Sequence, residues 1–190
     1  MSTSENVSLW KKRAEIDYMP LFISLWLSLN AWMKGQYTED KDRDMLEFLK
    51  KGGNRLSDRF AELIHAKDSN GIRFKGNFGE LHRALLNARI LYDNSRWPGQ
   101  VISFESCPVT WNNGSPKLES VVKTKHQKAK IKIDDNLWVE DDTDRLFAAY
   151  MEIVYQIRCT LFHGNLAPEP GNERVIRHLY LTLSMIMEYI

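Results

Sequence analysis

Residues 143–164 read TDRLFAAYMEIVYQIRCTLFHG, and this stretch decides the fold class. Apolar side chains recur at helical spacing along it, so the pattern predicts one long helix over residues 143–163. Thr143 and Asp144 suit an N-terminal cap and first turn, and Gly164 suits the C-terminal end. This helix is the informative element of a chain that we expect to be all-α.

Five further segments have helical patterns, at about residues 20–34, 38–51, 54–66, 77–92 and 172–190. The first of them is apolar on nearly every face, which is typical of a central, buried helix. Its apolar run is shorter than the roughly 18 residues that cross a bilayer, so we expect no membrane association.

The sequence pattern changes from helical to strand-like between about residues 94 and 136, where turn signals separate three short runs that are typical of strands. These runs are VISFES at 101–106, LESVVKT at 118–124 and KIKI at 130–133. The sequence therefore predicts a single domain over residues 1–190, a helical bundle with a small β-rich or irregular insertion.

The composition excludes several classes of protein. The 190 residues have a formal net charge of +1, which excludes a globally basic nucleic-acid binder but leaves room for a local basic patch. Cys107 and Cys159 form no CxxC motif, so we expect free thiols in the cytoplasm and neither a metal site nor a cofactor.

Arg158 stands out because its neighbours at helical spacing are apolar. A permanently charged guanidinium on such a face needs a partner. His163 follows five residues later, about 140° around an ideal helix and roughly 7.5 Å along it, although a helix end at Gly164 could let both reach one cleft. Two structural interpretations are open: an arginine that holds a carboxylate, and a histidine that caps the helix.

The segment RCTLFHG, residues 158–164, resembles the R-x4-6-H motif of HEPN domains, which are helical domains of prokaryotic toxins and defence systems. Residues 22–33, FISLWLSLNAWM, are similar to the first core helix of one HEPN branch. The resemblance implies a homodimer in which two motifs face each other across the two-fold axis. It also implies metal-independent cleavage of RNA and, in a toxin setting, an antitoxin or regulatory partner.

In that chemistry the 2′-OH of the RNA is the nucleophile. Arg158 would stabilise the charge on the phosphate, and His163 would be the general base or acid. The resemblance also suggests supporting residues. Cys159 stands where many members have Asn or Asp, and Asn165 stands where one subgroup has a tyrosine that its antitoxin modifies, so that form of inhibition is not expected here.

Three other polar features have more than one interpretation. Asn30 lies in an apolar helix and needs a partner, so it is either a core residue or orients His163 or a phosphate. His65 and His82 fall on polar helix faces and are expected at the surface. The lysines of the insertion, among them Lys123, Lys125, Lys128 and Lys130, either guide RNA phosphates or guard a strand edge beside the acidic stretch 134–144.

The alternative function is a catalytically inactive HEPN-like dimer that binds nucleotides, RNA or another protein. A third interpretation is a helical scaffold without affinity for nucleic acid.

Overall fold

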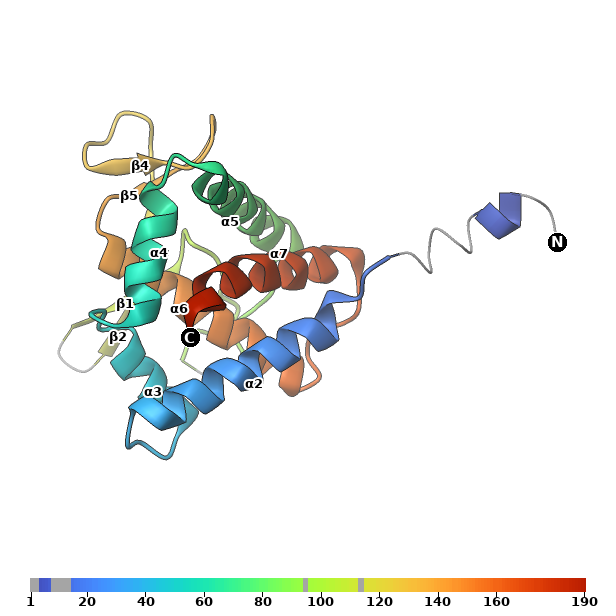
Figure 1. Ribbon diagram of the computed structural model, residues 1–190, viewed down its shortest axis with the longest axis horizontal. Helices are drawn as coiled ribbons and strands as arrows, with labels where there is room; N and C mark the ends of the chain where they lie inside the picture. Colours follow the sequence, from blue (N-terminus) through green and yellow to red (C-terminus); the bar gives the residue numbers. More distant parts are fainter. Residues whose placement is uncertain (1–3, 8–14, 94–95, 113–114) are drawn as a thin grey trace.

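The computed structural model describes residues 4–7, 15–93, 96–112 and 115–190, and residues 4–7 form one helical turn. The main helices are α2 (Tyr18–Gln36), α3 (Asp42–Leu49), α4 (Arg55–His65), α5 (Ser69–Ala88), α6 (Thr143–Phe162) and α7 (Pro170–Ile186), followed by the 3-10 turn η1 (Met187–Tyr189). As predicted, this part of the chain is mostly helical (Figure 1). None of its helices is long and apolar enough to cross a bilayer.

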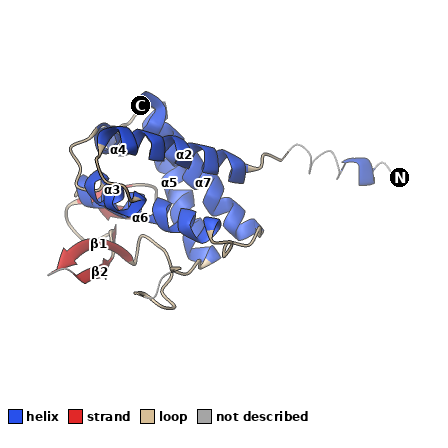
Figure 2. Ribbon diagram, turned by 90° about the horizontal axis from the view of Figure 1, so that it is seen from below, coloured by secondary structure: helices blue, strands red, loops and turns tan. Residues whose placement is uncertain are grey.

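The central helix is α6, and not the helix around residues 20–34 that the sequence predicted for this place. Residues 146–154 of α6 are buried on every side. By contrast, α2 buries one face only, at helical spacing from Phe22 to Met33. Its opposite face is open, so Leu27 is 55% exposed. The helix α7 packs against both α2 and α5 (Figure 2).

The helix predicted at residues 77–92 begins eight residues earlier, at Ser69. The early part contains Gly71 and Gly79, and glycine lowers helix propensity. Close packing requires glycine at 71, where a Cβ would lie 2.4 Å from the carbonyl oxygen of Ala66, and a Cβ at Gly79 would lie 2.8 Å from the carboxylate of Asp134, which would have to move aside.

Two small antiparallel sheets form the insertion. The strands β1 (Cys107–Asn112) and β2 (Ser115–Glu119) make a hairpin, and β3 (Val122–Lys123), β4 (Lys130–Lys132) and β5 (Trp138–Glu140) pair in the order β3-β5-β4. Two predictions here were wrong. The run 101–106 forms only isolated bridges, and the insertion ends with β5 at Glu140 rather than near residue 136. Residues 113 and 114, between β1 and β2 in the sequence, lie outside the described residues.

His82 is buried, contrary to the prediction that it lies at the surface, whereas His65 is exposed as predicted. The ring of His82 lies 6.3 Å from the ring of Phe104, and its Nδ1 has no hydrogen-bond partner among the described residues. Burial lowers the pKa of His82. Burial also lowers the pKa of His178.

We expect the free energy of unfolding to fall as the pH drops from 7 towards 5. Below pH about 6.5 the imidazole of His82 binds a proton in the unfolded chain but stays neutral in the folded chain, because burial lowers its pKa. A difference of one bound proton changes the free energy of unfolding by up to about 1.4 kcal/mol per pH unit. In urea titrations at several pH values, His82→Gln flattens this slope and the exposed control His65→Gln keeps it. Equal slopes for both variants would contradict the assignment to His82.

Candidate functional site

The C-terminal end of α6 carries both candidate catalytic residues. Arg158 lies in the penultimate turn, and His163 is the C-cap, whose backbone N–H donates to the carbonyl of Cys159 at 3.0 Å. Gly164 follows with φ 74°, a left-handed conformation that glycine adopts readily. The helix therefore ends at the predicted glycine.

Arg158 has a charged partner, as the sequence pattern predicted for a guanidinium on an apolar face. Its Nη2 donates to Oδ2 of Asp42 at 3.0 Å, at the start of α3. The guanidinium lies 5.1 Å from the ring centroid of Trp26 and 4.7 Å from that of Phe162. The side chain is 20% exposed, so this cation is held by a carboxylate and two aromatic rings and still reaches the surface.

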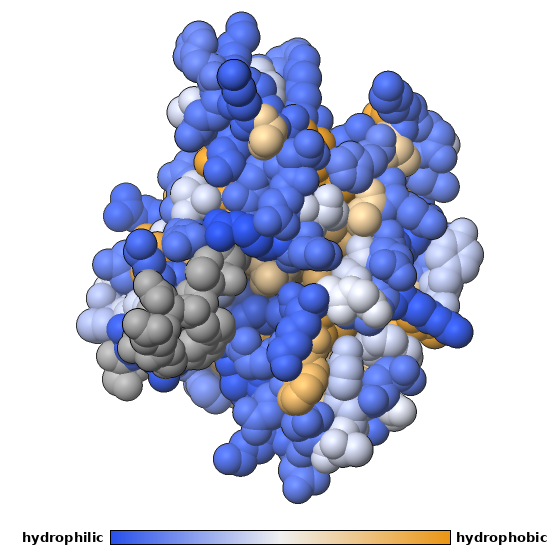
Figure 3. Space-filling view, turned by 90° about the vertical axis from the view of Figure 1, so that its left-hand side faces the viewer, coloured by the Kyte–Doolittle hydropathy of each residue, from blue (hydrophilic) through white to orange (hydrophobic). Residues whose placement is uncertain are grey.

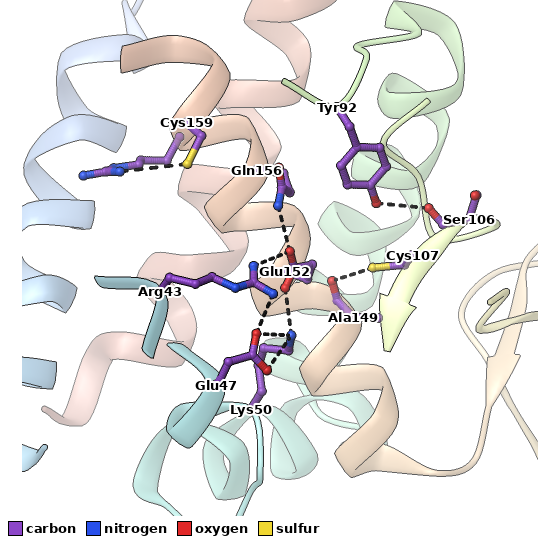
Figure 4. A network of polar contacts seen from close by, with 11 residues as sticks. Arg43, Glu47, Lys50, Tyr92, Ser106, Cys107, Ala149, Glu152, Gln156 and Cys159 are labelled. Atoms are coloured by element: carbon purple, nitrogen blue, oxygen red, sulfur yellow. Dashed lines mark hydrogen bonds and ion pairs between the residues drawn. The ribbon is translucent and has the colours of Figure 1, made fainter. Parts of the chain in front are cut away.

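The helix that supplies Asp42 is fixed to α6 by a buried polar network (Figure 4). Glu152 is fully buried and accepts hydrogen bonds from Arg43 at 2.7 Å, Lys50 at 2.7 Å and Gln156 at 2.8 Å. Arg43 belongs to α3, Lys50 directly follows α3, and Glu152 belongs to α6. Asp42 is therefore set beside Arg158 by contacts deeper in the fold.

Unpartnered polar atoms collect around Arg158. Five buried side-chain nitrogen or oxygen atoms of the described residues have no hydrogen-bond partner, and three of them belong to this neighbourhood: Trp26 Nε1, Asn30 Oδ1 and Arg158 Nε. Phe162, whose ring lies against Arg158, is 47% exposed. We call Trp26, Asn30, Arg158 and Phe162 the Arg158 face. Unsatisfied polar atoms beside exposed apolar side chains are typical of a surface that another molecule covers.

His163 has a different partner. Its Nδ1 lies 2.5 Å from Oδ2 of Asp93, in the loop after α5, and the histidine side chain is 61% exposed. Hydrogen bonding from His163, supplemented by Asn165, lowers the pKa of Asp93. Asp93 is well placed because its neighbour Tyr92 is buried, with its hydroxyl donating to the carbonyl of Ser106 at 3.1 Å.

Arg158 and His163 thus share one helix end but face different parts of the chain. Within the described residues, no hydrogen bond joins them, and each is held by its own carboxylate. This separation follows from their five-residue spacing. His163 lies at the surface, with its Nδ1 paired to Asp93. The side chain of Arg158, on the same helix end, is 20% exposed.

The supporting candidates divide between these two centres. The amide of Asn30 donates to Oδ1 of Asp42 at 3.2 Å, so it supports Arg158 through that carboxylate rather than contacting His163. Asn165 joins the His163 centre through Asp93. Cys159 is half-buried, with its Sγ 3.9 Å from Nη1 of Arg158 (Figure 4). Burial and a hydrogen bond with Cys159 raise the pKa of Tyr155 to about 12.

The candidate RNA-binding lysines lie far from this end. They belong to the three-stranded sheet, which joins the first turn of α6 through the ion pair between Glu140 and Arg145 at 2.9 Å. Lys123 and Lys130 lie on its edge strands, and Lys125 and Lys128 lie in the loop between those strands. The structure therefore does not bring them together with Arg158 and His163.

Sequence reasoning missed Asp42 and Asp93. The sequence did indicate that Arg158 needs a counter-charge, but it offered no way to choose among 25 acidic residues. Among the residues that the structure describes, no group of three or more His, Cys, Asp or Glu side chains is arranged to hold a metal ion.

Comparison with protein-family models, with curated proteins and with solved structures gives no match to this chain.

Proposed function

We propose that the chain is a metal-independent endoribonuclease of a toxin or defence system, with a HEPN-like fold, and that it acts as a homodimer. The observation that carries this proposal is the pair formed by His163 and Asp93 at 2.5 Å, on an imidazole that is 61% exposed. A carboxylate on Nδ1 fixes the tautomer and the ring, and leaves Nε2 to exchange a proton with a substrate.

The reaction uses the nucleophile that RNA itself carries. An imidazole removes the proton of the 2′-OH, the oxygen attacks the adjacent phosphorus, and the bond from phosphorus to the 5′ oxygen breaks. A second imidazole protonates the departing 5′ oxygen. The products are a 2′,3′-cyclic phosphate and a 5′-OH end. In a dimer the two copies of His163 supply the base and the acid, and Arg158 stabilises the charge on the phosphate oxygens.

The Arg158 face supports the dimeric part of the proposal. It combines the exposed ring of Phe162 with the partly exposed guanidinium of Arg158, and a second copy would cover both together. One observation favours the alternative, a catalytically inactive dimer that binds nucleotides, RNA or a protein: Asp42 already neutralises Arg158 at 3.0 Å.

Cleavage of total RNA and a tRNA pool in the presence of EDTA separates these functions. The ribonuclease produces fragments with cyclic-phosphate ends, and its elution on a sizing column corresponds to a dimer. RNA that stays intact with a folded, dimeric protein would overturn the proposed activity and leave the binding module. Intact RNA with no measurable affinity would remove both.

Asp93→Asn is expected to lower kcat about tenfold, a part of the 10²- to 10⁴-fold that an oriented general acid or base contributes. The amide keeps the shape of the side chain but lacks the charge that compensates an imidazolium, so the pH–rate profile also moves. The matched control is Asp135→Asn, whose side chain is 92% exposed at the other end of the molecule. An unchanged kcat and profile for Asp93→Asn would contradict the role of Asp93.

A further inference from the structure

The loop between β3 and β4, residues 124–129, carries two lysines, Lys125 and Lys128, that form no ion pair within the described residues. We call it the lysine loop. Its side chains are all exposed, and His126 likewise has no ion pair within the described part of the chain. Within the loop, the side chain of Gln127 accepts a hydrogen bond from the N–H of Thr124 at 2.7 Å.

Strand-edge protection accounts for the neighbouring lysines but not for those of the loop. The edge strands of the sheet are β3 and β4. On β3, Lys123 pairs with Glu140 at 3.5 Å, and on β4, Lys132 pairs with Asp135 at 2.7 Å. Lys125 and Lys128 lie on no strand, so guarding an edge gives no reason for their charge.

The nearby carboxylates are mostly engaged elsewhere. Glu140 and Glu119 both pair with Arg145, at 2.9 and 3.0 Å. Asp134 pairs with Arg83 at 2.7 Å. Asp141 touches the base of the loop through its backbone N–H, which donates to the carbonyl of Ala129 at 3.0 Å. The tip of the loop therefore keeps its positive charge, on a side of the molecule that is largely hydrophilic (Figure 3).

The lysine loop and His163 lie at opposite ends of α6 (Figure 1). The sheet joins α6 at Arg145 in its first turn, and the 20 residues of α6 end at Phe162, directly before His163. At 1.5 Å per residue this separation is roughly 30 Å. A nucleic acid that contacts both the lysine loop and His163 must span this distance, and a rigid one holds its phosphates at fixed positions along it.

We infer that the substrate is a structured RNA, with a double-helical stem on the lysine loop and an unpaired segment at His163; this inference rests on the proposed function. A stem of about ten base pairs spans the distance at roughly 3 Å of rise per base pair. Lysine is a point charge that contacts phosphate, and the lysine loop has no Phe, Tyr or Trp on which unpaired bases could stack, with His126 as its single aromatic ring. Such a surface suits a duplex, whose phosphates are already spaced.

The test compares two RNAs that share one unpaired cleavage segment, with and without a stem of about twelve base pairs. We expect the stem to raise kcat/KM about tenfold for the wild-type protein, and Lys128→Glu to remove most of that gain. The stemless RNA is cut equally by both proteins. The matched control Lys34→Glu makes the same charge change in the last turn of α2 and keeps the gain.

The salt dependence of stem binding, followed by fluorescence anisotropy, gives a second readout. Lys128→Glu lowers its slope by about one, which is the loss of one phosphate contact, and Lys34→Glu leaves it unchanged. Equal cleavage of both RNAs, or equal behaviour of the two variants, would overturn the inference while the ribonuclease stands. Failure of the wild-type protein to cut either RNA would overturn the proposed function, and this inference with it.

Discussion

His163→Ala leaves the chain folded and lowers the rate of RNA cleavage by about 10²- to 10⁴-fold, the range that one general acid or base contributes. The side chain is 61% exposed and contacts the chain through Asp93, so its loss removes little packing. The measurement is the cleavage rate in EDTA, with the melting temperature recorded beside it. His65→Ala is the matched control, since His65 is another exposed histidine, on α4.

Arg158→Ala also loses cleavage but differs from His163→Ala in stability. Removing the guanidinium leaves Asp42 without its counter-charge, a cost of about 1–3 kcal/mol for a partly buried hydrogen-bonded group. Cleavage by His163→Ala at the wild-type rate would end the assignment of this site. A melting temperature that falls as far for His163→Ala as for Arg158→Ala would assign His163 a structural role instead.

Glu152→Ala is expected to lower the free energy of unfolding by about 3–5 kcal/mol, because it leaves buried cations without their partner. Lys50 is only 6% exposed in its side chain and would retain Glu47 at 3.2 Å. Burial raises the pKa of Glu152, but Lys50 and Arg43 outweigh it, so the net pKa is lowered. This contribution to stability is therefore present above pH about 4.5 and is lost as the pH falls below it.

For a chain of this size the expected loss corresponds to roughly 10–15 °C in melting temperature. Glu62→Ala is the control: its side chain is 69% exposed and pairs with Arg59 at 2.9 Å, so the cost is at most about 1 kcal/mol. The double variant Lys50→Met/Glu152→Leu should regain part of the loss, since it removes an unpaired charge. Equal melting temperatures for Glu152→Ala and Glu62→Ala would show that the buried network contributes little.

Local pattern predicted the helices well where apolar spacing and end signals agreed. Residues 54–66 were predicted as a helix and form α4 at Arg55–His65, capped by Asn54. The start of α5 was missed because Gly71 and Gly79 lower the helix propensity there, whereas their value lies in close packing, of Gly71 on the backbone of Ala66 and of Gly79 on the distant Asp134. The central helix is α6, whereas the sequence predicted α2 for that place. A helix that is apolar on all faces can still have one face exposed, because the sequence does not show which faces the neighbouring helices cover.

For the candidate site, the sequence likewise indicated that Arg158 needs a partner but not which residue supplies it. Sequence alone showed that Arg158 is a charge on an apolar stripe, and this follows from helix geometry. Its partner Asp42 is 116 residues away along the chain, and the partner of His163 is 70 residues away. Pairings of that range are set by the packing of whole helices, here by the network that ties α3 to α6.

In the proposed function, the pair of Arg158 with Asp42 would make the arginine selective for its ligand. Any phosphate that binds there competes with a carboxylate already in place at 3.0 Å, whose own position is fixed by Asn30 at 3.2 Å. A free phosphate ion or a mononucleotide has few other contacts with which to offset that exchange. A polymer anchored at several points along the protein has many, so the internal carboxylate acts as an affinity threshold that favours long ligands over the abundant small anions of a cell.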